Sequence, residues 1–358
     1  MKRKNTQEKG AHAKAQRRKG GWQERRAGKF RERVVTWFAE NGRDLPWRRT
    51  TDPYAILVSE IMCQQTQVGT VAPFFERWMR RFPDCGTLAG ATEHEVMSLW
   101  QGLGYYSRAR NLHAAAKAVA AAGEFPREIE GIRALPGVGR YTAGAIVAFA
   151  YDEPAALVDA NIARVLARVF AVREAIDGPG LARVWAEAEA LQAKRGGRAF
   201  NGGLMEIGAL ICTPRAPRCG ECPVAAFCEA RAKGLQEVIP SKKAKPRTVR
   251  VTERCALMTR NGEVLLEHQD GSRWRGLWKL PAVKKIPEKA PELVIEYPFT
   301  HHKVTLAVYR QKAGRGEKKG CRWWSFGGLK EVPMAAGHRK AVERMVRTAG
   351  DLSGRSPS

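Results

Sequence analysis

The feature that most constrains this chain is a short loop that holds four of its eight cysteines. Cys212, Cys219, Cys222 and Cys228 follow the spacing Cys-x6-Cys-x2-Cys-x5-Cys, so any fold must bring four thiols close together. Four clustered thiols in a chain with no secretory signal indicate metal ligation before disulfide bonding. Such a set can ligate zinc or a [4Fe–4S] cluster.

The spacing of these cysteines favours the iron–sulfur cluster. Zinc ribbons usually carry two Cys-x2-Cys pairs set well apart, whereas this loop has one pair. Structural zinc and a chance grouping remain as alternatives. Arg215 and Arg218 lie between the first two cysteines, and a loop closed by metal can use two arginines to grip phosphate. We therefore predict a structural and DNA-binding role for the loop.

The charge of the chain points to a polyanionic partner. The formal net charge is +26, from 62 basic and 36 acidic residues. Residues 1–29 hold eleven Lys or Arg against Glu8 and Glu24, a net +9, which leaves +17 on the rest of the chain. Neutralised phosphates release counterions and favour binding, so we expect double-stranded DNA as the partner. An acidic membrane surface is the alternative that charge alone allows.

The hydrophobic residues give no sign of a membrane protein or a secreted protein. No run of about 18 uncharged apolar residues is present, which is the length that a membrane helix needs. No apolar run follows the basic start of the chain, so no secretory signal is indicated. We expect a monomer that works in the cytoplasm at the nucleoid, with no membrane contact.

The pattern of apolar and polar residues predicts a mainly α domain followed by a smaller α+β domain. Residues 161–170 place Ile162, Val165, Leu166, Val169 and Phe170 on one helix face. After residue 250 the pattern alternates, with Asn261-Gly262 as a hairpin signal, strands at 303–310 and 321–326, and a helix at 337–348. The predicted divisions are a basic disordered tail (1–28), a helical domain with the cysteine loop (29–232, loop 212–228), a basic linker (233–250), an α+β domain (251–350) and a disordered tail (351–358).

A glycine-containing turn resembles a phosphate clamp. Leu135-Pro136-Gly137-Val138-Gly139 precedes a predicted helix over 141–150. Gly137 and Gly139 allow backbone N–H groups to point outward at an anion. The pattern alone is weak, but beside the basic charge and the cysteine loop it indicates a helix-hairpin-helix contact. Such contacts position a duplex without reading its sequence.

Two carboxylates are candidates for catalysis, and each has a structural alternative. Glu60 lies in the apolar run 56–62, where an acid is costly unless it is paired or functional. Asp159 opens the helix over 161–170 and could simply cap it. Gln64 and Gln65 follow Glu60 and suit contacts to base edges, or a solvated face. Tyr105 offers a stacking surface beside a base, or core packing.

Together these segments resemble the adenine DNA glycosylases of the MutY family, within the endonuclease III superfamily. The matching segments occur in the family's order, between about residues 30 and 230. They are Leu45-Pro46-Trp47, Ser59 to Val68, Gly102 to Arg108, Leu135 to Gly144, Val158-Asp159 with Asn161, and the four cysteines. The resemblance implies a helix-hairpin-helix glycosylase domain with a [4Fe–4S] loop.

The resemblance also implies roles for particular residues. Glu60 would protonate adenine at N7, and Asp159 would stabilise the oxocarbenium-like sugar before water adds. Tyr141 stands where bifunctional relatives carry a lysine, and a phenol cannot form a Schiff base. We therefore expect a monofunctional glycosylase. Gln65 and Tyr105 match the positions that intercalate into the duplex.

The C-terminal part resembles the Nudix-like domain with which this family recognises 8-oxoguanine opposite the adenine. Gly276 to Pro281 matches a family Gly-Leu-Trp-x-x-Pro signature, and Phe299-Thr300-His301 falls where a Phe-Ser-His loop reads the oxidised base. The hydrolytic Nudix signature is absent, since Ala282 stands where it requires Glu, so pyrophosphatase activity is not expected.

Several residues depart from the family pattern. Gly202 replaces a Gln or Glu expected near the adenine, Ala160 replaces a Gly beside Asp159, and Cys63 replaces a Leu. These changes concern specificity more than chemistry. Excision of adenine opposite 8-oxoguanine or guanine is the leading hypothesis. An iron–sulfur mismatch glycosylase for another base, such as thymine, is one alternative, and a lesion-binding scaffold without catalysis is the other.

Overall fold

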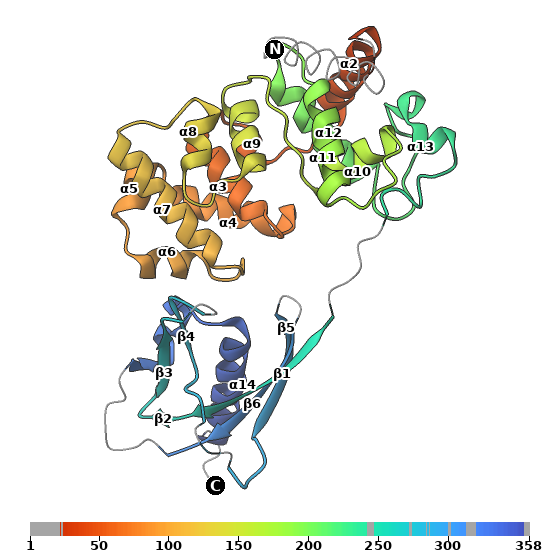
Figure 1. Cartoon of the computed structure of the whole chain (residues 1–358). Helices are drawn as coiled ribbons and strands as arrows, with labels where there is room; N and C mark the ends of the chain where they lie inside the picture. The colour runs from red at the N-terminus through yellow and green to blue at the C-terminus, as the bar shows by residue number, and fades with distance from the viewer. Residues whose placement is uncertain are drawn as a thin grey trace, which may run out of the picture. The chain divides into compact units, whose positions relative to one another are not determined.

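The computed structural model of the chain describes residues 22, 24–241, 247–271, 274–283, 285, 287–299, 302–312 and 320–353. The chain divides into two compact units (Figure 1). The first unit holds Met1–Met79, Pro83–Cys85 and Ala118–Ala244, and the second holds Arg80–Phe82, Gly86–Lys117 and Lys245–Ser358. The domain limits expected from the sequence, 29–232 and 251–350, stay a prediction.

The first unit is built from helices, as the periodicity of its apolar residues predicts. Short turns connect them, and in the described residues of this unit no strand longer than an isolated bridge occurs. The helices are α2 (Glu24–Asn41), α3 (Pro53–Cys63), α4 (Val68–Arg81), α8 (Ile129–Ala134), α9 (Arg140–Ala150), α10 (Ala160–Val169), α11 (Gly178–Ala190), α12 (Gly197–Leu210) and α13 (Glu229–Ala232), with the 3-10 turns η1 (Pro46–Arg48) and η2 (Ala225–Phe227).

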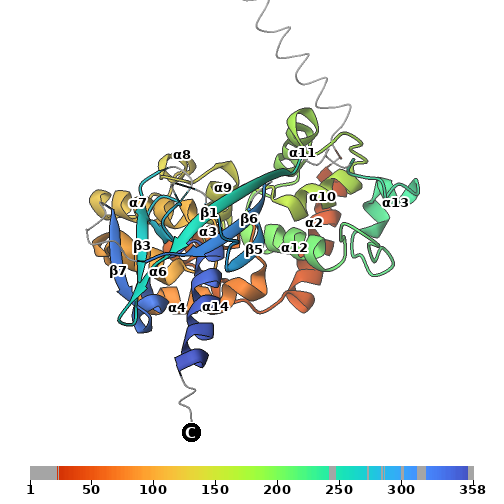
Figure 2. The ribbon, with the colours of Figure 1, turned by 90° about the horizontal axis from the view of Figure 1, so that it is seen from below.

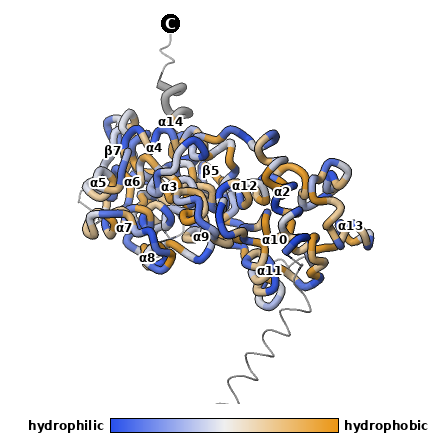
Figure 3. The backbone as a smooth tube through the Cα atoms, turned by 90° about the horizontal axis from the view of Figure 1, so that it is seen from above, coloured by the Kyte–Doolittle hydropathy of each residue, from blue (hydrophilic) through white to orange (hydrophobic). Residues whose placement is uncertain are grey.

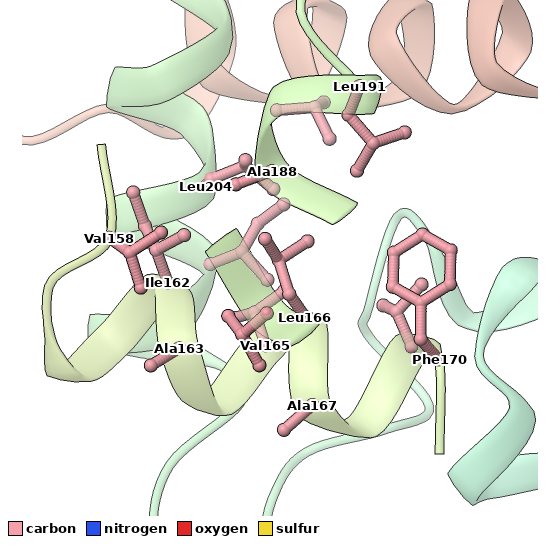
Figure 4. Close-up of a cluster of buried hydrophobic side chains, with 14 of the residues drawn as sticks. Val158, Ile162, Ala163, Val165, Leu166, Ala167, Phe170, Ala188, Leu191 and Leu204 are labelled. Atoms are coloured by element: carbon pink, nitrogen blue, oxygen red, sulfur yellow. The ribbon is translucent and has the colours of Figure 1, made fainter. Parts of the chain in front are cut away.

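Helix α10 lies at the centre of the core of this unit. Its predicted apolar face is confirmed, since Ile162, Val165, Leu166, Val169 and Phe170 are all buried. Figure 4 shows Ile162, Val165, Leu166 and Phe170 in one cluster, to which α11 and the residue after it add Ala188 and Leu191 and α12 adds Leu204. Burial of one face fixes the orientation of α10, and so fixes the residues at its first turn.

The N-terminal tail ends earlier than the sequence predicts. Helix α2 begins at Glu24, so the prediction of disorder is wrong for residues 24–28; residues 1–21 and 23 lie outside the described residues. Trp22 explains the early start, because its ring lies 5.2 Å from Phe30, 4.9 Å from Phe170 and 5.6 Å from Phe227. Aromatic packing therefore anchors a segment whose many charges suggested disorder.

The predicted linker is also shorter than expected. Residues 233–241 stay with the first unit, since Ile239 is buried in its core and Ser241 bridges Ala175. Residues 242–246 lie outside the described residues, and strand β1 begins at Val249. Described elements therefore occupy both ends of the predicted 233–250 linker.

The second unit combines three helices with the C-terminal sheets. Its helical part is α5 (Cys85–Gly90), α6 (Glu93–Trp100) and α7 (Ser107–Ala122), and Thr92 and Glu95 form a capping box at the start of α6. The C-terminal part holds β1 (Val249–Leu257), β2 (Thr259–Arg260), β3 (Glu263–Gln269), β4 (Leu277–Lys279), β5 (Leu293–Phe299), β6 (His302–Arg310), β7 (Cys321–Ser325), the 3-10 turn η3 (Gly327–Glu331) and α14 (Ala336–Ser353).

These strands form two sheets (Figure 2). Buried side chains from both sheets meet in one apolar cluster. In the first sheet the order is β1-β6-β5, with β1 parallel and β5 antiparallel to β6. In the second, β2, β4 and β7 all pair antiparallel with β3. Helix α14 packs its buried Ala341, Val342 and Met345 into the cluster. The predicted α+β fold is confirmed; α14 reaches Ser353, so the first three residues of the predicted 351–358 tail are helical.

The predicted hairpin at Asn261-Gly262 is confirmed and shows why that dipeptide was informative. Thr259 pairs with Val264 and Arg260 with Glu263, so the two residues form the whole turn. Asn261 has φ 42° and Gly262 has φ 77°, the left-handed pair that a tight hairpin of this kind requires.

Hydrophilic and hydrophobic residues are interleaved along the described chain (Figure 3). No helix of the described residues is long and apolar enough to cross a membrane.

Candidate functional site

The first unit contains a polar cavity of about 680 Å³ at which four of its helices meet. Its lining comes from the end of α3 and the loop after it, from the start of α9, from the first turn of α10 and from α12. Glu60, Tyr141 and Asp159, the three residues that sequence reasoning assigned to catalysis, all line it. The fold therefore brings together carboxylates that lie about one hundred residues apart in the chain. The volume lies within the range of ordinary ligand pockets.

Glu60 is presented by a buried helix with a firm start. Asp52 caps α3 by accepting hydrogen bonds from the N–H groups of Tyr54 and Ala55, and Pro53 occupies the first helical position. Nine consecutive residues of α3, Tyr54–Met62, are buried, and Glu60 is 6% exposed. Burial raises the pKa of Glu60 to about 7, against the lowering effect of a hydrogen bond from Tyr141. A carboxyl group of this pKa holds its proton on a substantial fraction of molecules at neutral pH.

Tyr141 is the direct partner of Glu60. Its hydroxyl donates a hydrogen bond of 2.6 Å to Oε2 of Glu60. Burial and the two neighbouring carboxylates, Glu60 and Asp159, raise the pKa of Tyr141 well above its ordinary value, so the phenol keeps its proton. Tyr141 can orient the carboxyl group of Glu60, but it offers no amine for covalent catalysis.

Asp159 is the N-cap of α10, as its structural alternative predicts. It also lies on the cavity wall, as a catalytic role requires. It caps α10, since Oδ1 accepts a 2.7 Å hydrogen bond from the N–H of Ile162. Oδ2 accepts a 3.0 Å hydrogen bond from the amide of Asn161. Burial raises its pKa, while these hydrogen bonds act in the opposite direction. The first turn of α10 thus holds a carboxylate at a fixed position on the cavity wall.

The amide of Asn161 is in turn held by Arg164. Nη2 of Arg164 donates 2.9 Å to Oδ1 of Asn161 and 2.6 Å to the carbonyl oxygen of Gly208, and Nε donates 2.6 Å to the carbonyl oxygen of Cys212. A continuous set of hydrogen bonds therefore runs from Asp159 to the first cysteine of the loop. Sequence reasoning did not identify Arg164.

A third acidic residue of the cavity, Glu206, was also missed by sequence reasoning. Glu206 of α12 is fully buried and binds Arg43 through two 2.8 Å hydrogen bonds and Arg48 through one of 2.7 Å. Burial alone would raise the pKa of Glu206, but the two guanidinium groups outweigh it and lower the pKa. The available signal was an acid in the apolar run 204–210, the same signal that singled out Glu60.

The glutamines that follow Glu60 lie at the mouth of the cavity. Gln64 and Gln65 both line it, and Gln65 is exposed. Gln65 has φ 56°, a left-handed conformation that is uncommon for a residue with a side chain and typical of functional loops. The structure therefore brings these two predicted DNA-binding residues to the catalytic candidates.

Tyr105 belongs to the second unit and has the same kind of backbone. Its φ is 46°, and its side chain is 45% exposed. The guanidinium carbon of Arg108 lies 5.6 Å from the centre of the Tyr105 ring, while Nη2 of Arg108 binds the carbonyl oxygens of Leu103 and Gly104. An exposed ring held on a constrained loop suits stacking on a base.

The predicted hairpin motif has the expected geometry. Helices α8 and α9 are joined by residues 135–139, in which the N–H of Val138 bonds to the carbonyl oxygen of Leu135. Gly137 has φ 77°, as the third residue of a type II turn requires after Pro136. Gly139 is the N-cap of α9 and supplies no side chain, so the first N–H groups of the helix remain accessible to an anion.

The four cysteines line one cavity in the first unit. Cys212, Cys219, Cys222 and Cys228 share it with apolar side chains of α10 and α12. No disulfide joins them. Among the described residues, no three His, Cys, Asp or Glu side chains converge closely enough to hold a single metal ion. The four thiols thus lie around one pocket, as the ligands of a single metal centre must.

Two arginines stabilise the loop from different sides. Buried Arg168 of α10 donates to the carbonyl oxygens of Ile239 and Thr213, each at 2.8 Å, and to Sγ of Cys212 at 3.2 Å. Arg218 pairs with Glu221 at 2.8 Å and with the carbonyl oxygen of Leu210 at 2.7 Å. Arg215, the other predicted phosphate-binding residue, lies exposed on the loop.

Only part of the predicted lesion-reading segment can be placed. Phe299 ends β5, and its ring lies 4.7 Å from that of Trp274. Thr300 and His301 lie outside the described residues. The Gly276 to Pro281 signature contains β4, whose Trp278 and Leu277 pair with β3.

Family models match the two parts of the helical region. Residues 58–183 match the model of the HhH-GPD superfamily base excision DNA repair protein. Residues 212–228 match the iron–sulfur binding domain of endonuclease III. The cysteine loop binds a [4Fe–4S] cluster, as its spacing predicted.

Relatives of known name cover most of the chain. The adenine DNA glycosylase of Homo sapiens is 36% identical over 341 residues, which is 90% of this chain and 62% of the relative. Those of Buchnera aphidicola (strain Bp) and Mycolicibacterium smegmatis are 34% and 40% identical, over 78% and 56% of this chain and 84% and 69% of the relatives. The chain spans 48–62% of the length of the mammalian relatives it matches.

Solved structures of similar fold cover the helical part. A thermostable thymine-DNA glycosylase is 31% identical, with a TM-score of 0.53 over 59% of this chain and 98% of that chain. Endonuclease III in a non-covalent DNA complex has a TM-score of 0.51 over 60% of this chain and 99% of that chain, and its 22% identity supports the fold alone.

Proposed function

The chain belongs to the adenine DNA glycosylase family, and from this premise we propose that it excises adenine mispaired with 8-oxoguanine or guanine in double-stranded DNA. The observation that carries the proposal is the pair of Glu60 and Tyr141, joined by a 2.6 Å hydrogen bond in the same cavity as Asp159. A weak acid and a fixed carboxylate are the two groups that hydrolysis of a glycosidic bond requires.

Glu60 acts as the general acid in this proposal. Its raised pKa of about 7 keeps a proton available near neutral pH, and Tyr141 orients the carboxyl group by donating to Oε2. The proton moves from Glu60 to N7 of a flipped adenine. The C1′–N9 bond then breaks with its electron pair moving onto the base, which becomes a neutral leaving group.

Asp159 stabilises the positive charge that develops on the sugar. Its carboxylate is fixed by Ile162 and Asn161, so it needs little reorganisation as the charge appears. Water adds at C1′ and loses a proton, which leaves an abasic site and free adenine. Because Tyr141 cannot form a Schiff base, the strand stays intact, and the enzyme is monofunctional.

In this proposal, residues from several segments of the sequence bind the duplex. The hairpin residues Gly137 and Gly139 and the loop residues Arg215 and Arg218 contact phosphates, while Gln64, Gln65 and Tyr105 occupy space in the base stack. The cluster, held by the four cysteines, gives the loop the stability that phosphate contact needs. The enzyme works as a monomer in the cytoplasm, at the nucleoid.

The C-terminal sheets supply recognition of the oxidised base opposite the adenine. Phe299, beside Trp274, is the described member of that site, and Thr300 and His301 complete it. This role follows from the resemblance of the segment to the family's Phe-Ser-His loop. Alignment with the human adenine glycosylase over 90% of the chain includes these sheets, which favours adenine as the substrate.

One other function has a specific observation in its favour. The likeness to a thymine-DNA glycosylase at 31% identity covers the helical part, and Tyr141 is compatible with either base. A scaffold without catalysis has no comparable support, because a pure binding protein has no need of two buried acids on one cavity.

The test is a set of three labelled duplexes under single-turnover conditions. They carry adenine opposite 8-oxoguanine, adenine opposite guanine, and thymine opposite guanine, with alkali used to reveal abasic sites. Release of adenine from the first two, with no strand cleavage before alkali, supports the proposal. Release of thymine alone assigns the protein to mismatch thymine repair. Tight binding with no release from any duplex indicates a scaffold.

A further inference from the structure

Glu60 also lines a second cavity of the first unit. It has a volume of about 150 Å³ and shares Trp47, Arg48, Glu60 and Met205 with the larger cavity described above. The remaining wall is formed largely by aromatic and aliphatic side chains, with Gly202 of α12 among them. Glu60 therefore borders both cavities, and the second one adds largely apolar space beside this side chain.

The polar groups at the rim of this second cavity are already paired. Nη2 of Arg198 donates to the carbonyl oxygens of Arg48 and Thr50, at 2.7 and 2.6 Å. Arg48 in turn binds Glu206. These hydrogen bonds fix the rim and leave the aromatic interior as the unfilled part. An apolar cavity of about 150 Å³ can hold a ring the size of benzene.

Gly202 is the residue that keeps this space open. Helix α12 contains two consecutive glycines, but only Gly203 is required by packing, since a Cβ there would lie 2.6 Å from Cγ1 and 3.0 Å from the carbonyl oxygen of Val34. A Cβ on Gly202 would meet only the tip of the Phe38 ring, at 2.8 and 3.1 Å. A glycine inside a helix is less stable than alanine, and at position 202 a Cβ would press on the end of the Phe38 side chain of α2, which lines the same cavity.

The proposed role of Glu60 determines which part of the purine would lie near the second cavity. In the proposed mechanism Glu60 protonates N7, and the exocyclic amine at C6 lies beside N7 on the same edge of the base. A base whose N7 faces Glu60 therefore brings a substituent on that amine close to the side chain that both cavities share. The apolar lining suits an alkyl group and not a second polar group.

We propose that Gly202 and the second cavity lined by Glu60 allow this enzyme to excise adenines that carry a small apolar substituent on the exocyclic amine, with N6-methyladenine as the simplest case. This inference rests on the proposed adenine glycosylase function and assigns its substrate range. A longer side chain at position 202 would enter the cavity and exclude the substituent, while unsubstituted adenine would still fit.

The test measures single-turnover release from duplexes with adenine or N6-methyladenine opposite 8-oxoguanine. The wild type is compared with Gly202→Gln, Gly202→Ala and Gly90→Ala, the last being a matched control because a Cβ at Gly90 meets no atom within 4 Å. Iron–sulfur absorbance and duplex affinity report folding of each variant.

We expect the wild type and Gly90→Ala to release both bases at rates within about tenfold of each other. Gly202→Gln should lose N6-methyladenine release selectively, by about 10- to 200-fold relative to adenine, with Gly202→Ala in between. Wild type that releases adenine but rejects N6-methyladenine overturns the inference and leaves the proposed function standing. Equal release of N6-methyladenine by wild type and Gly202→Gln also overturns it. Absence of adenine release instead contradicts the proposed function itself.

Discussion

Asp159 combines two tasks that substitutions can separate. Its carboxylate caps α10 through Ile162, and it lines the cavity beside Glu60. Asparagine is as good an N-cap as aspartate but carries no charge, so Asp159→Asn should retain the thermal stability of the protein while single-turnover excision falls by about 10²- to 10³-fold. Asp159→Ala should lose the same activity and also about 1 kcal/mol of stability. Paired rate and melting measurements check this, and activity that survives in Asp159→Asn would reduce Asp159 to a helix cap.

The pKa of Glu60 predicts how the rate depends on pH. The active form is the protonated acid, and its pKa is raised to about 7, so the rate should be highest below this value and fall as the pH rises through it. The hydrogen bond from Tyr141 lowers that pKa, since it favours the charged carboxylate. Tyr141→Phe should therefore move the descending limb to higher pH. A limb that stays in place or moves to lower pH would exclude Glu60 as the titrating acid.

At the scale of elements, α10 connects the catalytic carboxylate to the iron–sulfur loop. Asp159 begins the helix, Arg164 binds Asn161 and the carbonyl oxygen of Cys212, and Arg168 binds Cys212 directly. One rigid helix thus fixes both sites, because its opposite face is buried in the core. We therefore expect that a shift of the iron–sulfur loop moves α10 and with it the position of Asp159 in the cavity.

Arg168 is the residue of α10 whose substitution tests this connection between the helix and the iron–sulfur loop. Arg168→Met keeps an unbranched apolar stem but removes the guanidinium group with its hydrogen bonds to Ile239, Thr213 and Cys212. Since one charge-assisted hydrogen bond contributes more than about 1.4 kcal/mol, cluster loss in chelator should accelerate by roughly tenfold or more. Iron–sulfur absorbance over time measures it, with exposed Arg195→Met as the control. Equal decay in both variants would show that Arg168 does not stabilise the loop.

Most elements could be predicted from the sequence because local patterns determine them. The apolar face of α10 and the turn at Asn261-Gly262 rest on periodicity and backbone preference, and both appear as expected. The start of α2 could not be predicted, because Trp22 is ordered by rings that lie far away in the sequence. Composition described the charges of that segment but not its tertiary contacts.

Residues of the site could be predicted only where they belong to a recognisable sequence motif. Glu60, Asp159 and the cysteines have recognisable neighbours in the sequence, and they lie where a site would need them. Arg43, Arg48 and Glu206 were missed because their role depends on ion pairs between residues 43–48 and α12, about 160 residues apart. A buried acid in an apolar helix was visible at Glu206, but its partners were not.

At the scale of the whole molecule, net charge predicts how binding depends on salt. A protein at +26 that neutralises several phosphates should lose affinity for undamaged duplex by about 10³- to 10⁵-fold between 50 and 200 mM salt, if 6–10 contacts form. Fluorescence anisotropy over a salt series measures this slope. Deletion of residues 1–21, which carry eight of the Lys and Arg residues and one Glu, should reduce the slope. An unchanged slope would show that the N-terminal segment does not bind DNA.

The central claim is that Glu60 is the acid that expels the base, and one comparison tests it most directly. Single-turnover adenine release is measured at pH 7 for wild type, Glu60→Gln and Glu189→Gln, an acid whose side chain is 57% exposed and pairs with Arg140. Glutamine keeps the shape but cannot donate an acid proton, so Glu60→Gln should be slower by about 10²- to 10⁴-fold, with normal duplex affinity and cluster absorbance. Glu189→Gln should match wild type. Release by Glu60→Gln within tenfold of wild type would contradict the account.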